Sequence, residues 1–281
     1  MSIKLVAFDM DGTLLDSNKN LPPDFMDWVV KHPEIKTVIA SGRQYYKLVK
    51  DFVPIKKQLV FASENGGFVF ENDQVLYSNE MKKEDILRCL ELIWSIEGLT
   101  PVLCGAESAY IERTSESVCG LVGMYYERLL QTDDLRASVL QDTIVKIAVL
   151  VDERRAETAI RNFKKIDGHL SAVLSGDSWI DFSNQTANKG AAIIAIQKKY
   201  GIKKEECMAF GDYLNDVEML QCCGESYCME NGHPDLKRIA KYIAASNDNN
   251  GVMDVLRQIG ETPLPMDNCR VSFSKNGESQ I

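Results

Sequence analysis

The 281-residue sequence contains no uninterrupted apolar segment of the roughly 18 residues that a membrane-spanning helix needs, so we expect no transmembrane span. It also lacks an excess of basic residues, because 32 lysines and arginines stand against 41 aspartates and glutamates, for a net charge of −9. A nucleic-acid-binding surface needs clustered basic side chains to contact phosphates. We therefore expect neither nucleic acid nor a membrane among the partners.

The sequence also lacks a secretory signal, a zinc-binding cysteine pattern and a nucleotide-binding glycine loop. Its first residues lead directly into an apolar strand, which leaves no room for a signal peptide, and we expect a cytoplasmic protein. In that reducing compartment the eight cysteines predict buried or incidental thiols, and the close group Cys222, Cys223 and Cys228 lacks C-x-x-C spacing. The pair Gly66-Gly67 is too short to cradle a nucleotide. With 45% hydrophobic and 26% charged residues, the chain predicts an ordinary globular protein of one large or two smaller domains.

Two carboxylates mark the end of the first apolar segment. Residues 3–8 predict a strand that leads into Asp9 and Asp11, followed by Gly12. The carboxyl edge of an open α/β sheet is where ligands bind, and paired carboxylates there suit a hard cation such as Mg²⁺. Since alternate strand residues point to opposite faces, Asp9 and Asp11 can share a direction, one as nucleophile and one as acid. An ordinary strand-end turn is the alternative interpretation, because Asp and Gly are common turn residues.

A second polar cluster follows the next predicted strand. Residues 35–40 are apolar and end in Ser41-Gly42-Arg43, directly before a predicted helix over 44–52. A hydroxyl group and the backbone N–H groups that open a helix can hold phosphate oxygens. Taken alone, the same residues also fit a helix N-cap serine followed by a turn glycine.

Two further clusters lie in the last third of the chain. Lys189 opens a predicted helix that runs to residue 200. A cation there would offset repulsion among carboxylates and stabilise charge that develops in phosphoryl transfer, although a lone lysine at a helix start is usually solvated. The strand predicted over 206–210 leads into a tight turn that contains Asp212, Asn215 and Asp216. Asp212 could bind Mg²⁺ directly, Asp216 could hold a metal-bound water or Lys189, and Asn215 could donate to phosphate.

In this order, the segment Asp9-Met10-Asp11-Gly12-Thr13 and the three later clusters resemble the four motifs of the haloacid dehalogenase-like (HAD) hydrolases, and the resemblance covers residues 3 to about 260. It implies that Asp9 is the phosphate-accepting nucleophile and Asp11 the general acid and base. It implies that the phosphoryl group is bound by Ser41, Gly42, Arg43, Lys189 and Asn215. It also implies Mg²⁺ as cofactor, bound by the Asp9 carboxylate, the Asp11 main-chain carbonyl and the Asp212 carboxylate, with Asp216 behind them.

The segment between the second and third motifs predicts a separate α+β unit. Residues 82–185 alternate between helical and strand patterns, with 112–141 interpreted as a polar, helical stretch. This position and order resemble the C2B-type cap of the Cof-type HAD phosphatases. The fold we expect is α/β, with a Rossmann-like doubly wound parallel sheet core over 1–81 and 186–260 and this inserted cap. Residues 261–281 lie beyond the resemblance and predict a loosely packed polar extension.

The resemblance implies a Mg²⁺-dependent phosphatase that hydrolyses a small-molecule phosphate ester through a phospho-aspartate intermediate. Sugar phosphates, or phosphorylated cofactors such as pyridoxal phosphate and flavin mononucleotide, are the substrates it indicates. A phosphomutase of the phosphomannomutase type shares the motifs and the cap, and a non-catalytic binding protein on the same fold is a further alternative; a dehalogenase would not carry Asp11. Charged cap residues such as Glu107, Arg113 and Asp177 could contact the leaving group or belong to a solvated face. We expect a monomer or a homodimer.

Overall fold

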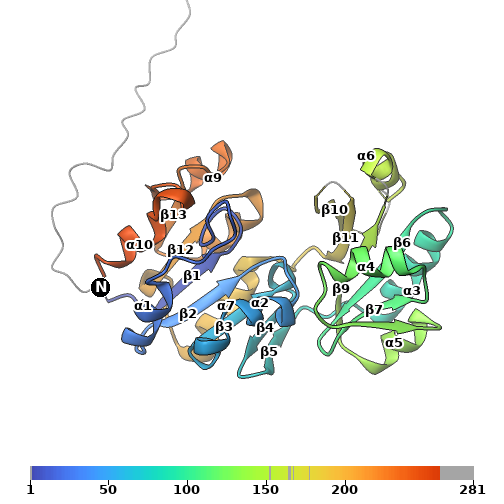
Figure 1. The fold of residues 1–281 in the computed structure, drawn as a ribbon, viewed down its shortest axis with the longest axis horizontal. Helices are drawn as coiled ribbons and strands as arrows, with labels where there is room; N and C mark the ends of the chain where they lie inside the picture. Colours follow the sequence, from blue (N-terminus) through green and yellow to red (C-terminus); the bar gives the residue numbers. More distant parts are fainter. Residues whose placement is uncertain (1, 152, 164–165, 167, 177, 260–281) are drawn as a thin grey trace, which may run out of the picture.

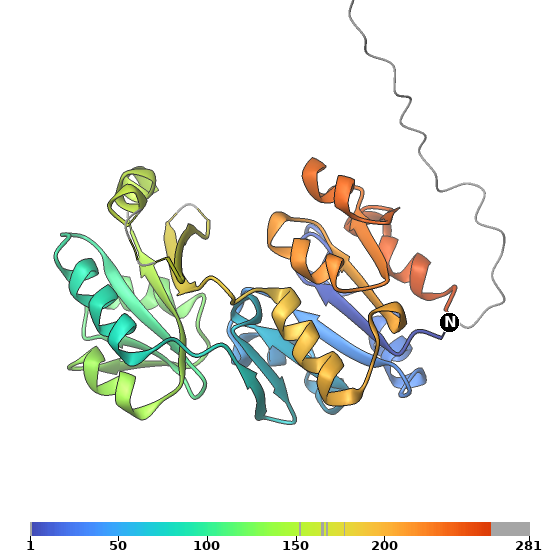
Figure 2. The same cartoon turned by 180° about the vertical axis from the view of Figure 1, so that it is seen from behind.

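The computed structural model describes residues 2–259 except for 152, 164–165, 167 and 177. The chain forms two lobes, each built around its own β-sheet, and it crosses between them twice (Figure 1, Figure 2). One crossing joins strand β5 (Gln74–Ser78) to helix α3 (Lys83–Trp94), and the other joins strand β11 (Trp179–Asn184) to helix α7 (Lys189–Tyr200). The second lobe is therefore an insertion into the first.

The first lobe is organised around strand β1 (Leu5–Asp9), which lies inside an eight-stranded sheet. Helices cover both faces of this sheet, so that Val6 and Phe8 pack into one core and Leu5 and Ala7 into the other. All five residues of β1 are buried. A strand buried on both faces has no polar alternation, which explains why it reads as a continuous apolar run.

The order of the strands confirms the predicted doubly wound α/β core. Across the sheet it is β14 (Tyr242–Ala244), β13 (Glu225–Met229), β12 (Cys207–Gly211), β1, β2 (Lys36–Ala40), β3 (Leu59–Ser63), β4 (Phe68–Glu71) and β5. The strands from β14 to β3 are parallel, and β4 and β5 form an antiparallel extension at one edge. One face is covered by α1 (Phe25–Lys31), α2 (Tyr45–Asp51) and α10 (Gly251–Leu256). The other is covered by α7, α8 (Val217–Gln221) and α9 (Pro234–Ile239).

The inserted lobe contains a six-stranded, mostly antiparallel sheet. In spatial order its strands are β10 (Leu170–Leu174), β11, β9 (Ile144–Leu150), β6 (Thr100–Gly105), β7 (Ala109–Glu112) and β8 (Leu129–Thr132). One face packs against α3, α5 (Leu135–Gln141) and α6 (Glu153–Asn162). The opposite face is covered in part by α4 (Glu116–Gly123) and the segment that follows it. This lobe is the α+β cap that the sequence predicts.

One element differs from the sequence predictions. The helical interpretation of 112–141 is wrong at β8, an edge strand that pairs in parallel with β7. Leu130 and Gln131 in its centre are both exposed, so β8 lacks the alternation that identifies a half-buried strand. The predicted extension 261–281 lies outside the described residues.

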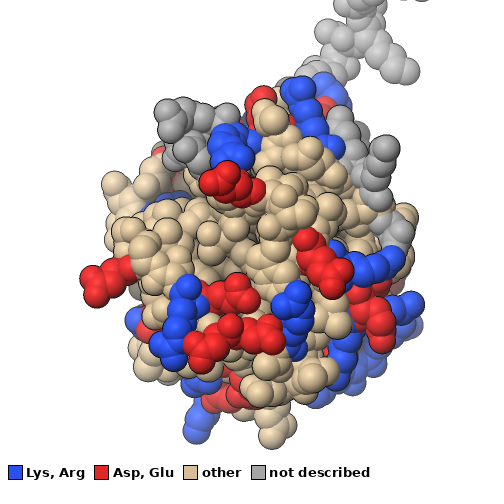
Figure 3. Space-filling view, turned by 90° about the vertical axis from the view of Figure 1, so that its right-hand side faces the viewer, with Lys and Arg blue, Asp and Glu red and all other residues tan. Residues whose placement is uncertain are grey.

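Three features of the described residues concern the expectations drawn from composition: the distribution of surface charge, the state of the cysteines and the length of the apolar helices. Figure 3 shows the outer face of the inserted lobe, where lysines and arginines are interspersed with aspartates and glutamates. None of the seven cysteines in the described part of the chain forms a disulfide bond. Among the described residues, no helix combines the length and the apolar character needed to cross a bilayer.

Candidate active site

Side chains from distant parts of the sequence meet at the carboxyl edge of the core sheet. Asp9 is the last residue of β1, Lys189 is the first residue of α7, and Asp216 immediately precedes α8. Lys189 Nζ lies 2.5 Å from Asp9 Oδ1 and 2.6 Å from Asp216 Oδ1. The second Asp216 oxygen accepts hydrogen bonds from the backbone N–H groups of Asp212 (3.0 Å) and Tyr213 (3.2 Å). Asp216 therefore fixes both the lysine and the loop that carries Asp212.

Three carboxylates at this edge form a cluster that could hold a metal ion. One oxygen from each of Asp9, Asp212 and Asp216 lies within 4.8 Å of the other two. Both Asp216 oxygens accept hydrogen bonds from protein donors, whereas Lys189 donates to one oxygen of Asp9 and Thr13 to one oxygen of Asp212, so Asp9 and Asp212 are the acids better placed to bind a metal ion. Gly12 allows the close approach of Asp212, because its φ is +83° and a Cβ atom there would lie 2.4 Å from Asp212 Oδ2. Such hard oxygen donors fit Mg²⁺.

The charges of this cluster also favour a bound cation. Burial raises the pKa of Asp9 to about 8, although the neighbouring Lys189 ammonium lowers it. Burial disfavours the Lys189 ammonium, but the charges of Asp216 and Asp9 outweigh burial and raise the pKa of Lys189 above its usual value. Burial and the charge of Asp216 also raise the pKa of Asp212. Three acids around one lysine thus leave an excess of negative charge, which a divalent cation would neutralise.

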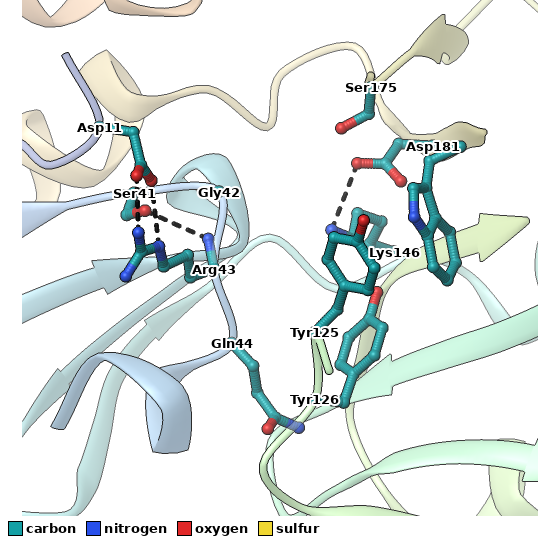
Figure 4. Close-up of a pocket in the computed structure, with 11 residues that line it drawn as sticks. Asp11, Ser41, Gly42, Arg43, Gln44, Tyr125, Tyr126, Lys146, Ser175 and Asp181 are labelled. Atoms are coloured by element: carbon teal, nitrogen blue, oxygen red, sulfur yellow. Dashed lines mark hydrogen bonds and ion pairs between the residues drawn. The ribbon is translucent and has the colours of Figure 1, made fainter. Parts of the chain in front are cut away.

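Asp11 lies in a different electrostatic environment from Asp9. Its carboxylate accepts two hydrogen bonds from Arg43, at 3.0 Å from Nε and 2.6 Å from Nη2 (Figure 4). It accepts a third from Lys19 Nζ at 2.8 Å. Partial burial would raise the pKa of Asp11, but these hydrogen bonds outweigh burial and hold it below its usual value. The arrangement favours the carboxylate form, so this ion pair must open before Asp11 can donate a proton.

Asn65 is a further polar residue beside the site, in addition to those that the sequence predicts. It lies in the turn between β3 and β4, where Glu64, Asn65 and Gly66 all have positive φ angles. Its Oδ1 atom accepts a hydrogen bond of 3.0 Å from Asn215 Nδ2, and its side chain lies beside Gly42. Left-handed backbone at a non-glycine residue is uncommon and clusters at functional sites. The signal in the sequence was Glu64, directly before the Asn65-Gly66 turn. Glutamate, unlike asparagine or glycine, rarely adopts a positive φ angle.

The same turn supports the start of helix α7. Gly66 has a φ of +87°, and a Cβ atom there would lie 2.2 Å from the backbone oxygen of Asn188, the residue before Lys189. We expect Gly66→Ala to displace the start of α7 and to lower the free energy of unfolding by about 2 kcal/mol or more, through backbone strain and overpacking together. Urea denaturation would measure the loss of stability, and activity assays would measure the effect of the displaced helix start on the site.

Gly201 provides the matched control for this prediction. Its φ is also positive, at +65°, but no atom lies within 4 Å of the position of its Cβ. Gly201→Ala should therefore show the cost of the left-handed backbone alone, with activity unchanged. Equal losses of stability in the two variants would contradict the proposed contact with Asn188.

A cavity of about 210 Å³ lies between the lobes beside this edge (Figure 4). The core contributes Asp11, Ser41, Gly42, Arg43 and Gln44 to its wall, and the inserted lobe contributes residues that include Lys146, Trp179 and Asp181. The predicted residues Ser41, Gly42 and Arg43 thus face the cavity, whereas Lys189 is completely buried below it. Glu107 and Arg113 are absent from the described lining, and Arg113 forms an exposed ion pair with Asp133. Asp177 lies outside the described residues.

The lobes also make direct contacts around the cavity. The side-chain amide of Gln44 donates to the Arg128 carbonyl (2.9 Å) and accepts from the Arg128 N–H (3.0 Å). The Tyr46 hydroxyl donates to the Ala106 carbonyl at 2.9 Å, and the Arg128 guanidinium lies 3.7 Å from the centre of the Tyr46 ring. Helix α2 of the core therefore holds the inserted lobe over the cavity.

A buried carboxylate at the end of a central strand, with a lysine to balance it and an inserted lobe above, is the arrangement of a hydrolase that acts through an aspartate. A family model described as haloacid dehalogenase-like hydrolase matches residues 6–256, and the chain belongs to this family. It is a phosphoric monoester hydrolase of the phosphatase branch, as the sequence predicts.

Individual relatives agree with this assignment. The chain is 33% identical to the 5-amino-6-(5-phospho-D-ribitylamino)uracil phosphatase YbjI of Escherichia coli (strain K12), over 95% of this chain and 100% of the relative. Its fold is similar to that of TM0651 from Thermotoga maritima, with a TM-score of 0.83 and 20% identity over 92% of this chain and 98% of that one. It is also similar to a HAD subclass IIB sugar phosphatase, with a TM-score of 0.72 and 20% identity over 92% and 99% of the two chains. The predicted fold, a HAD core with an inserted C2B-type cap (subclass IIB), is confirmed.

Proposed function

We propose that this enzyme hydrolyses small phosphorylated metabolites in a Mg²⁺-dependent reaction with a phospho-aspartate intermediate on Asp9. The observation that carries the proposal is the position of Asp9, buried at the end of β1, 2.5 Å from Lys189 and close to Asp212. The core would comprise residues 1–81 and 186–260, and residues 82–185 would act as the cap that closes over the substrate. The cytoplasmic location and the monomeric or dimeric state stay predictions.

The reaction proceeds in two displacements. An Asp9 carboxylate oxygen attacks phosphorus, the ester P–O bond breaks, and Asp11 transfers a proton to the departing alkoxide. In the second step Asp11 takes a proton from water, the water oxygen attacks phosphorus, and the bond to Asp9 breaks to release inorganic phosphate. In the first step the hydrogen bonds between Asp11 and Arg43 must break so that Asp11 can contact the leaving group. Arg43 is then able to bind a phosphoryl oxygen.

The other predicted residues hold the reacting groups. Lys189 would stabilise the phosphoryl oxygens together with Ser41, the backbone at Gly42, and Asn215, which is oriented by Asn65. Asp9, the Asp11 main-chain carbonyl and Asp212 would hold Mg²⁺, which when bound supplies neutralisation of the negative charge between nucleophile and phosphate. Asp216 keeps Lys189 and the Asp212 loop in place.

The substrate named for the Escherichia coli relative is a candidate for this chain as well. That compound carries its phosphate on a ribityl chain that ends in a uracil ring, so its leaving group combines hydroxyl groups with a flat ring. We expect 5-amino-6-(5-phospho-D-ribitylamino)uracil to be hydrolysed with a higher kcat/KM than hexose phosphates in a panel of phosphate esters. Isomerisation of hexose phosphates with a bisphosphate activator, without net phosphate release, would instead indicate a mutase.

Metal removal tests the Mg²⁺ dependence. Phosphate release should fall to background in excess EDTA and return when Mg²⁺ is added beyond the chelator, because the carboxylate cluster is then neutralised again. Mg²⁺ should also raise the Tm of the metal-free protein, and it should raise that of Asp212→Asn much less. Full turnover in EDTA would contradict the metal assignment, and no turnover with any ester of the panel would favour a binding protein.

A further inference from the structure

A second buried charge cluster, outside the reacting groups, joins the two lobes. Lys146 Nζ lies 2.6 Å from Glu64 Oε2 and 3.3 Å from Asp181 Oδ2. Glu64 comes from the strained β3–β4 turn of the core, whereas Lys146 and Asp181 come from the neighbouring cap strands β9 and β11. All three side chains are more than nine-tenths buried. A charge cluster with this degree of burial is costly, and apolar residues of similar volume would often be at least as stable.

The position of the cluster offers a reason for that cost. Lys146 and Asp181 both line the cavity that also contains Asp11 and Ser41 (Figure 4). Asp181 stands opposite Ala148 in the β9–β11 register, two residues beyond Lys146, so that both side chains lie on the same face of the cap sheet. Glu64, in contrast, is not part of the cavity wall and approaches Lys146 from the core.

The chemistry of the cluster selects the kind of group that it can bind. The Lys146 ammonium has three N–H donors and forms ion pairs with two carboxylates among the described residues, so at least one N–H is available for a ligand. The Asp181 carboxylate still has free lone pairs to accept a hydrogen bond. A hydroxyl group can accept from Lys146 and donate to Asp181 at the same time.

The charge balance excludes a second anionic group at this position. One lysine with two acids offers no net positive charge, and Lys146 is the one cation among the described cap residues that line the cavity. A second phosphate or a carboxylate of the substrate would therefore meet Asp181 without a free counter-ion. The same balance disfavours a bisphosphate, which a mutase of the phosphomannomutase type would have to bind.

We propose that Lys146 and Asp181 are specificity-determining residues that bind a hydroxyl group of the leaving group, and that Glu64 positions the Lys146 ammonium. The enzyme then prefers phosphate esters of polyhydroxylated chains over esters that carry a second anionic group at this depth. This inference rests on the proposed phosphatase function and names the substrate class of that same site.

The test compares kcat/KM for two monoesters, ribitol 5-phosphate and p-nitrophenyl phosphate, of which only the first offers hydroxyl groups. In Lys146→Met the ratio of the two values should fall by tenfold or more, mainly through KM for ribitol 5-phosphate, because a hydrogen bond from a charged donor is lost. Lys198→Met, at an exposed position of α7, is the control and should keep the wild-type ratio. Glu64→Ala should lower the ratio as well, and Glu64→Gln, which retains an oxygen acceptor, should restore part of it.

Asp181→Asn gives an independent measurement should Lys146→Met fail to fold. Removal of its charge should raise kcat/KM for fructose 1,6-bisphosphate relative to fructose 6-phosphate by several fold, since the repulsion of the second phosphate is reduced. Equal losses with both monoesters in Lys146→Met, or an unchanged bisphosphate ratio in Asp181→Asn, would overturn the inference while the phosphatase function stands. A wild-type protein that releases phosphate from no ester would overturn both.

Discussion

Replacement of Asp9 by asparagine should lower kcat for phosphate release by at least about 10⁴-fold, because an amide oxygen cannot form the phospho-enzyme. The substitution preserves the size of the side chain, and Lys189 keeps its contact with Asp216 at 2.6 Å. The folded structure should therefore persist, with a Tm close to that of the wild type. Initial rates with p-nitrophenyl phosphate, at saturating Mg²⁺, provide the measurement.

A second readout separates the nucleophile from a residue that only binds metal. Rapid acid quench of the wild-type enzyme with ³²P-labelled ester should trap a labelled protein, and the Asp9→Asn variant should trap none. Asp27→Asn changes an exposed aspartate of α1 and should behave as the wild type in both assays. Near-normal turnover, or labelling in the absence of the Asp9 carboxylate, would remove Asp9 from its assigned role.

Replacement of Lys189 by methionine should abolish activity and also destabilise the fold by about 3–5 kcal/mol, the usual cost of removing one partner of a buried ion pair. Lys189 is completely buried and lies between Asp9 and Asp216, so the variant leaves two carboxylates facing each other without a cation. Urea denaturation in EDTA would measure the loss of stability. The double variant with Asp216→Asn should recover part of the stability but none of the activity.

The loss of stability in Lys189→Met should depend on pH in a defined direction. Burial already raises the pKa of Asp9 to about 8, and the variant removes the lysine that lowers it. The unfolded chain has an aspartate pKa of about 3.9, so between this value and about 8 the folded variant binds more protons than the unfolded chain. In the wild type this proton excess ends at about pH 8, whereas in the variant, whose Asp9 pKa is higher still, it extends to higher pH, so the stability of the variant relative to the wild type should decrease as the pH rises through about 8. A gap that stayed constant, or that widened in acid, would contradict the proposed packing of the three charges.

The core of the fold could be predicted from the sequence because its parallel strands are buried on both faces. Such strands appear as short apolar runs, and the polar residues at their ends mark the edge where Asp9 and Asp212 meet. Strand β8 could not be predicted in this way, since its centre is exposed and carries no periodic signal. An edge strand of this kind is defined by its neighbour β7, which the local sequence does not reveal.

The cap side of the site was harder to predict for a related reason. Lys146 and Asp181 each interrupt an apolar strand, and this is a visible signal for a buried charge. The partner that balances Lys146 is Glu64, which precedes it by 82 positions and belongs to the other lobe. Only the folded arrangement of the lobes identifies that pairing. It also shows that Lys146 and Asp181 line the cavity, whereas Glu64 does not.

The contact between Gln44 and Arg128 has a consequence for how this lobe arrangement can evolve. Both hydrogen bonds reach the backbone of residue 128, one to its N–H and one to its carbonyl. Any amino acid except proline supplies those two groups, so position 128 can vary among homologous proteins while position 44 keeps its amide. The cap can thus acquire new side chains around its rim, and with them new substrates, without losing its register on the catalytic lobe.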